Sequence, residues 1–282
     1  MKKAVLFIIL IGSLHSCAFD KKGFEFDNFK NTPLWELAKA VKDNDADLIK
    51  ELMKSNKLYI DFKEPINQQT LLTLAIVNEK KEAFMILLNM GANPNMLLGT
   101  NKNSTPLTES ILNQKDCDLF YIENLLKNGA NPNLEIIPED KENYFFYNYP
   151  LFAAITKHDK NSNECINTVK LLVEYNADIN CCHPRPLNED VCEGVIEACL
   201  TIRSMENLRY FVIEKKIKIP KIVYIIGEID KATQKEYSLT EILNTNDYKF
   251  EDFEDELGKH TFKREREIKK EILEYLKKTR KE

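Results

Sequence analysis

The sequence predicts an all-α solenoid of about five helix-turn-helix units with short hairpin loops, closed by C-terminal capping helices. Three observations lead to this fold class: one segment recurs along the chain, its spacing is typical of stacked helical pairs, and a small residue recurs at a fixed place in every copy. The composition fits a folded chain, since 43% of the 282 residues are apolar and 30% are charged. Eight Gly and ten Pro are too few for a collagen-like or low-complexity sequence.

The repeated segment is most evident in three copies, which run from Thr70 to Asn95, from Thr105 to Asn133 and from Tyr149 to Asn180. The first two close on Gly-Ala-Asn-Pro-Asn and the third closes on Asn-Ala-Asp-Ile-Asn. Two further copies appear 35 residues before the Thr70 copy and 124 residues after it. The aligned second-helix positions are separated by 35, 38, 47 and 39 residues, which indicates insertions between stacked units. These positions are Leu52, Leu87, Leu125, Leu172 and Phe211.

Each copy carries residues that suit the packing of a helical pair. A leucine or isoleucine fills the space between units, and a small residue three positions later lets the two helices approach. Gly91 and Gly129 suit a left-handed helix end, and Asn56 and Asn176 occupy the same place. The leucine or isoleucine positions are Leu37, Leu72, Leu107, Leu151 and Ile196, and the small residues are Ala40, Ala75, Ser110, Ala154 and Cys199.

The segments resemble the ankyrin repeat, whose pattern opens T-P-L-H-x-A and closes L-L-x-x-G-A-D-x-N. Thr-Pro at 32–33 and 105–106 shows the opening, and it suits a helix start because the hydroxyl can cap the helix and Pro fits its first turn. The resemblance covers residues 32–217 and implies that hairpin tips and inner helices form a surface for a protein partner. The family's histidine, which ties neighbouring turns together, is replaced here, so we expect a less regular stack. The replacements are Ala38, Thr73, Thr108 and Phe152.

The N-terminus has the pattern of an export signal, because Lys2 and Lys3 precede an unbroken apolar run over residues 4–11. The run is shorter than the roughly 20 residues that cross a bilayer. Leu14-His15-Ser16-Cys17 resembles the bacterial lipobox, which implies that Cys17 is acylated, and Ala18 resembles the residue that sorts lipoproteins to an outer membrane. We therefore expect a lipid-anchored protein of the bacterial envelope, facing the periplasm or the cell surface. An ordinary cleaved signal with a free Cys17 is the alternative.

The chain divides into a signal peptide over residues 1–16, a linker over 17–30, a repeat stack over 31–219 and a C-terminal cap with a charged helix over 220–282. The linker is expected to hold the stack off the lipid surface. Apolar residues at helical spacing predict an amphipathic terminal helix, and these are Ile268, Ile272, Tyr275 and Leu276. We expect this helix to dock on the cap, with binding to a membrane surface as the alternative.

Two insertions between units supply candidate partner contacts. The insertion from Leu134 to Asn148 holds consecutive aromatic residues, and rigid aromatic side chains make good interface anchors. A fold-back in which the insertion covers its own hydrophobic edge is the alternative. The hairpin one unit earlier supplies candidates through the ankyrin resemblance, with packing between hairpins as the alternative for its leucines. The candidates are Tyr144, Phe145, Phe146 and Tyr147 in the insertion and Leu97, Leu98, Asn101 and Lys102 in the hairpin.

Cys181-Cys182-His183 does not indicate a metal site, because adjacent cysteines cannot easily bind one ion and no second ligand pair lies at a suitable spacing. In an oxidising compartment these thiols are candidates for a disulfide with Cys165 or Cys192, and the sequence leaves the connectivity open. Cys192 and Cys199 are seven positions apart, which favours one buried face of a helix. No catalytic motif stands out. We therefore expect no catalysis, no cofactor and no small-molecule substrate, and the net charge of −5 argues against nucleic acid as a partner.

The sequence thus predicts a membrane-tethered module of the bacterial envelope that binds a protein partner. Two roles stay open. An immunity or inhibitor protein would occlude a secreted toxin in a tight one-to-one complex, whereas a scaffold would stabilise a periplasmic enzyme or an envelope complex. An unrecognised enzyme is the third alternative, and it would need a polar cluster in a pocket.

Overall fold

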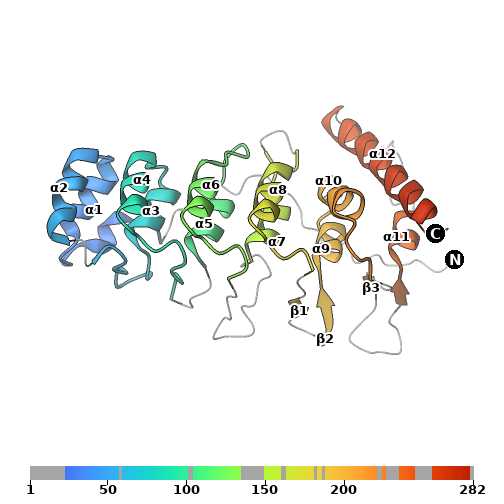
Figure 1. Ribbon diagram of the computed structural model, residues 1–282, viewed down its shortest axis with the longest axis horizontal. Coiled ribbons are helices and arrows are strands. Elements are labelled where there is room, and N and C mark those ends of the chain that lie inside the picture. The colour runs from blue at the N-terminus through green and yellow to red at the C-terminus, as the bar shows by residue number, and fades with distance from the viewer. Residues whose placement is uncertain are drawn as a thin grey trace.

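The computed structural model describes residues 23–56, 59–100, 104–134, 149–159, 163–180, 183–185, 188–220, 224–226, 235–244 and 256–279. Helical pairs follow one another in a single row, and a long C-terminal helix lies across the last pair (Figure 1). The described chain is thus an all-α solenoid, as predicted. Units 1 to 5 are α1 (Trp35–Asp43) with α2 (Ala46–Asn56), α3 (Leu71–Val77) with α4 (Lys81–Asn89), α5 (Pro106–Leu112) with α6 (Phe120–Lys127), α7 (Pro150–Ile155) with α8 (Ile166–Glu174), and α9 (Val195–Thr201) with α10 (Met205–Arg209).

The first helices of the units pack on one another in series, from α1 through α3, α5 and α7 to α9. We call this series the first-helix row. The five predicted leucine or isoleucine positions of the row are at most 3% exposed, and so are the five small residues three positions later. The sequence pattern therefore identified the packing positions correctly, because the same two positions of the first helix are buried in every unit.

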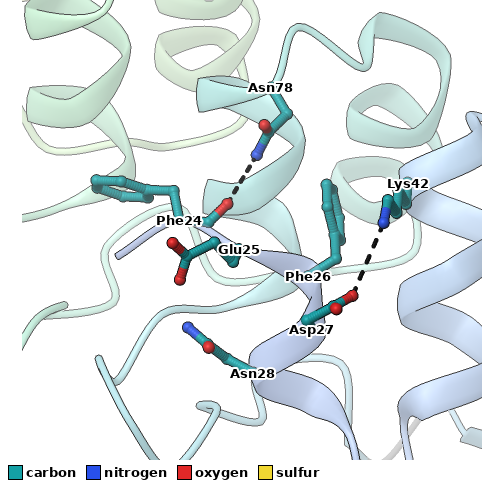
Figure 2. Close-up of a pocket in the computed structure, with 7 residues that line it drawn as sticks. All are labelled: Phe24, Glu25, Phe26, Asp27, Asn28, Lys42 and Asn78. Carbon is teal, nitrogen blue, oxygen red and sulfur yellow. Dashed lines mark hydrogen bonds and ion pairs between the residues drawn. The ribbon is translucent and has the colours of Figure 1, made fainter. Parts of the chain in front are cut away.

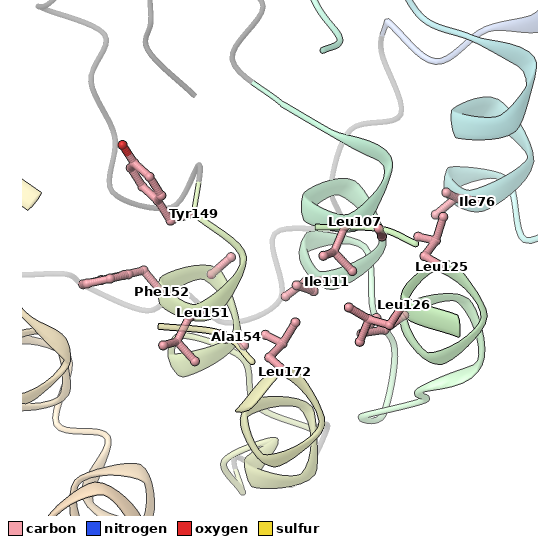
Figure 3. Packing of buried hydrophobic residues seen from close by; sticks show 14 of the residues in the cluster. Ile76, Leu107, Ile111, Leu125, Leu126, Tyr149, Leu151, Phe152, Ala154 and Leu172 are labelled. Atoms are coloured by element: carbon pink, nitrogen blue, oxygen red, sulfur yellow. The ribbon is translucent and has the colours of Figure 1, made fainter. Parts of the chain in front are cut away.

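The junction between units 3 and 4 shows how this packing is made. Ile111 of α5 and Leu126 of α6 point toward the space between the units, and Leu172 points into it from α8 (Figure 3). All three side chains are at most 4% exposed. Full burial of one such side chain contributes about 1.5–3 kcal/mol, so these hydrophobic contacts stabilise the junction by several kcal/mol.

Threonine hydroxyls begin two of the first helices. Thr105 caps α5 by accepting a hydrogen bond from Thr108 N (3.1 Å), with Pro106 in the first turn, as predicted. Thr70 caps α3 in the same way. The prediction for Thr32 is wrong: its hydroxyl donates to Phe29 O (2.7 Å) and accepts from Leu34 N, and α1 begins only at Trp35. Thr32 thus holds the turn that leads into α1.

Three of the four predicted left-handed positions are confirmed, with φ of 97° at Gly91, 87° at Gly129 and 63° at Asn176. Asn56 is the exception, because it is the last residue of α2. With no equivalent of the Gly-Ala-Asn-Pro-Asn turn after it, α2 extends two residues beyond the end that the alignment with α4 predicts.

Two short antiparallel hairpins accompany the last units. Strand β1 (His183–Arg185) pairs with β2 (Asn188–Glu193) before α9, and β3 (Tyr224–Ile226) pairs with β4 (Lys235–Tyr237) after unit 5. Cys192 therefore lies in a strand, and the prediction that it shares a helix face with Cys199 is wrong. Cys199 itself is fully buried in α9, as predicted.

The C-terminal segment closes the stack. It contains α11 (Leu239–Asn244) and α12 (Glu256–Thr279), and α12 packs on α10 and α11. Ile268, Ile272 and Leu276 are at most 7% exposed, which confirms that this amphipathic helix docks on the cap.

Three charge pairs fix α12 to unit 5. Arg203 binds both oxygens of Glu265 at 2.8 and 2.9 Å, and Arg264 Nε donates to Glu206 (2.7 Å). Arg209 Nε donates to Glu271 (2.6 Å) and its Nη1 donates to Glu214 (2.7 Å). The Arg209–Glu214 contact spans five residues, a spacing that the π-helical turn Tyr210–Glu214 brings onto one face.

Candidate partner-binding surface

The predicted contact residues fall into two groups. Leu98 is 0% exposed and its backbone pairs with Ser104, so its side chain is not available to a partner. Leu97 is partly buried, and its carbonyl accepts a hydrogen bond from Lys63 Nζ. The remaining candidates lie outside the described residues, and these are Asn101, Lys102, Tyr144, Phe145, Phe146, Tyr147 and the lipidation candidate Cys17.

The Asn-rich turns at the ends of the second helices join neighbouring units. Asn95 donates from Nδ2 to Gly129 O (2.9 Å) and accepts from Asn131 N (2.7 Å). Asn133 makes the same two contacts one unit later, with Asn176 O and Asp178 N, both at 2.7 Å. The closing asparagine of each Gly-Ala-Asn-Pro-Asn segment therefore stabilises the stack, and its side chain is already occupied in the absence of a partner.

The N-terminal segment lies on the first-helix row. Phe24, Phe26 and Phe29 are 8%, 5% and 0% exposed, and the last two belong to the short helix η1 (Phe26–Phe29). Asn78, the C-cap residue of α3, donates from Nδ2 to Phe24 O (3.1 Å) (Figure 2). Oδ1 of Asp27 lies 3.7 Å from Nζ of Lys42 in α1, as an ion pair (Figure 2). Part of the predicted linker over 17–30 is therefore packed on units 1 and 2.

Sequence reasoning did not identify these phenylalanines as buried residues. Their spacing matches neither a helix nor a strand, and charged residues separate them. Their burial depends on α1 and α3, which lie elsewhere in the chain.

Exposed apolar side chains are few among the described residues. The large ones are Leu48, Tyr59 and Ile66, at 40%, 51% and 61% exposure. Ile66 is of particular interest because its backbone is held rigidly: the buried carboxylate of Glu64 accepts hydrogen bonds from Ile66 N (2.7 Å) and Asn67 N (2.8 Å). A rigid apolar side chain on an exposed turn is well suited to anchor a partner. Sequence reasoning missed Ile66, although its position between Pro65 and Asn67 marks an apolar residue in a turn.

A disulfide joins units 3 and 4. Cys117, in the turn between α5 and α6, is bonded to Cys165 at the start of α8, with 5.3 Å between the Cα atoms. The alternative of a bond from Cys165 to Cys181 or Cys182 is therefore wrong. The helix-to-helix turns of adjacent units lie next to each other in the stack, and this proximity is not visible in the spacing of cysteines along the chain.

The residue next to this disulfide joins unit 4 to unit 5. The Glu164 carboxylate accepts hydrogen bonds from Ser204 Oγ (2.6 Å) and from the backbone N–H groups of Glu206 and Asn207, both at 2.9 Å. It therefore caps the N-terminus of α10 from the preceding unit. Glu164 and Cys165 together connect three consecutive units, so we call this pair the three-unit junction.

Comparison with known proteins finds the same repeat in part of the stack. Residues 37–136 match the family model for ankyrin repeats in three copies. Among solved structures, the crystal structure of the human ASB11 ankyrin repeat domain is similar, with 17% identity, a TM-score of 0.44, and coverage of 62% of this chain and 67% of that one. No curated protein matches the sequence.

Hydroxyl pairs occupy the place of the ankyrin histidine in two units. Thr73 lies 3.0 Å from the capping hydroxyl of Thr70, and Thr108 lies 2.9 Å from that of Thr105. A threonine at this position bonds within its own helix start and is too short to reach a neighbouring turn. In the described chain, the contacts between neighbouring turns include those of the asparagines, of the three-unit junction and of Asp61, which accepts a hydrogen bond from Asn93 N.

Burial shifts the pKa of one ionisable side chain in unit 3 and of one that follows α7 in unit 4. Glu109 of α5 is 6% exposed and accepts hydrogen bonds from Ser104 Oγ and from Asn113 Nδ2 (3.2 Å), and burial raises the pKa of its carboxyl. Lys157 donates to Leu112 O (2.8 Å), and burial lowers the pKa of its ammonium. Within the described ranges no cluster of three or more His, Cys, Asp or Glu side chains could hold a metal ion. No described helix is both long and apolar enough to span a membrane.

Proposed function

We propose that this chain is an exported, lipid-anchored ankyrin-repeat module that binds a protein partner and catalyses no reaction. The observation that carries the proposal is the ankyrin stack itself, because units of this kind serve as protein-interaction scaffolds. The Cys117–Cys165 disulfide supports export, since structural disulfides form and persist in oxidising compartments such as the bacterial periplasm. The lipobox-like sequence before Cys17 supports acylation and a place in the bacterial envelope.

The connections between units offer the best contact surface. Those that the structure describes, including the β1–β2 hairpin, project from one edge of the stack (Figure 1). Ile66 is displayed there by the Glu64 turn at 61% exposure. The aromatic insertion with Tyr144 and Tyr147 also connects two units. We assign the partner to this edge, with Ile66 and the two tyrosines as anchors.

Affinity capture with the full-length acylated chain from solubilised membranes tests this proposal. Ile66→Asp and the double variant Tyr144→Ala/Tyr147→Ala are expected to lose the partner. Leu48→Asp is the matched control, because Leu48 is also exposed but lies on α2, away from the connections. Equal recovery of the partner by all three variants would remove this edge from the proposal.

The captured partner also distinguishes the two roles. An immunity or inhibitor role requires that the purified chain bind a secreted toxin one to one and suppress its activity in titration. A scaffold role requires instead that an envelope enzyme or complex lose activity when the chain is deleted. A purified chain that turns over a substrate in the absence of any partner would contradict the non-catalytic proposal.

A further inference from the structure

The chain leaves the stack at a defined point. Phe24 is bound through its carbonyl to Asn78 of unit 2, and its ring is 8% exposed. Gly23 has φ +99°, a conformation that other residues rarely adopt, and a Cβ built on it would lie 3.7 Å from the Asn67 side chain. The backbone therefore turns at Gly23, between the Glu64 turn that precedes α3 and the C-cap residue of α3. The exit point lies on the first-helix row and not at the end of the stack.

The tether from this point to the lipid is short. This inference rests on the proposed acylation of Cys17, after which five residues precede Gly23. A fully extended chain spans at most about 3.6 Å per residue, so Cys17 lies within ~22 Å of Gly23. Packed helices are ~8–10 Å apart, so a row of five units is roughly twice as long as this tether. The membrane that holds the acyl chains therefore lies close to units 1 and 2, within about 22 Å of Gly23.

Side chains at the end of η1 and in α1 suit a lipid headgroup layer. Trp35, the one tryptophan of the chain, is partly buried beside this segment, with the ammonium groups of Lys30 and Lys39 at 5.6 and 5.5 Å from its ring centre. Tryptophan and lysine are favoured at the level of lipid headgroups. Lys30 pairs with Asp27 and Lys39 pairs with Glu36, so this side presents ion pairs to the headgroups. These side chains can contact the headgroup layer without entering the hydrocarbon.

We propose that the first-helix row of units 1 and 2 faces the phospholipid headgroups, and that the second helices α2 and α4 face away from the membrane. The predicted linker does not lift the stack clear of the bilayer, since residues 24–29 are part of the folded units.

The single tryptophan allows a direct test. The acylated chain is reconstituted into phosphatidylethanolamine–phosphatidylglycerol vesicles that carry a dansyl group on some headgroups, and energy transfer from Trp35 to dansyl is measured. The matched control is Trp35→Phe/Asn89→Trp, which moves the donor to an exposed position of α4 in unit 2. Transfer from Trp35 is expected to exceed transfer from the α4 position at least twofold. Equal transfer, or stronger transfer from α4, would overturn the proposed orientation.

Flotation of the vesicles separates this inference from the proposed function. The wild-type chain is expected to float with the vesicles and Cys17→Ala is expected to stay behind. If the wild type floats but Trp35 gives no excess transfer, the orientation is wrong and the anchor stands. If the chain isolated from the membrane carries no acyl group at Cys17 by mass spectrometry, the anchor is wrong, and the orientation falls with it.

Discussion

The Cys117–Cys165 disulfide should make a large and measurable contribution to the stability of the stack. The two cysteines are 48 positions apart, so the bond closes a long loop in the unfolded chain. For a loop of this length, the chain-entropy model predicts a stabilisation of ~4 kcal/mol at 25 °C. We therefore expect Cys117→Ala/Cys165→Ala to lower the free energy of unfolding by about 3–4 kcal/mol.

Urea denaturation followed by far-UV circular dichroism measures this change, with Cys199→Ala as the control for loss of a thiol outside the bond. Amide hydrogen exchange then locates the effect. Because Glu164 caps α10 from the position next to Cys165, faster exchange is expected in α10 as well as in α8. An unchanged urea midpoint would refute the loop-closure argument. Faster exchange confined to α8 would refute the role of the three-unit junction.

Three further changes test other parts of the structure. Ile272→Ala, at a fully buried position of α12, should lower the free energy of unfolding measured by urea denaturation by about 3 kcal/mol. Lys270→Ala, at an exposed position of the same helix, should lower it by less than about 0.5 kcal/mol. Thr105→Ala removes the cap of α5 and should cost about 1 kcal/mol by the same measurement; a change near zero would contradict the capping role. Burial raises the pKa of Glu109 above 4.5, so the folded chain holds this proton more tightly than the unfolded chain, and the resulting stability is lost as the pH rises through the raised pKa. Glu109→Gln should therefore have a higher urea midpoint than the wild type at pH 8, with a smaller difference at pH 5, and parallel pH profiles would count against this argument.

The packing positions of the stack could be predicted from the sequence because each one repeats. Leu72, Leu107 and Leu151 occupy equivalent places against equivalent neighbours, so the pattern that identifies one identifies all. The α12 docking face was predictable for a related reason, since its apolar residues follow the period of a helix.

Features that depend on a single contact could not be predicted in this way. Leu98 occurs in a connection that has no helical or strand period, so its spacing does not predict that its side chain is buried. Cys117 and Cys165 meet because two turns of adjacent units come together, which no spacing along the chain reveals. The phenylalanines of the N-terminal segment are buried by α1 and α3, so their role depends on helices that follow them in the sequence.

The charge pairs of α12 limit where this chain can gain or lose a unit. In unit 5 the helix binds Arg203, Glu206 and Arg209. No other unit carries this combination, and the equivalent residues of unit 2, for example, are Glu79, Glu82 and Met85. A duplication or deletion upstream of unit 5 leaves the terminal helix with the surface it recognises, whereas loss of unit 5 would leave it facing unmatched charges. Evolutionary changes in the length of this protein should therefore be confined to units ahead of the last one.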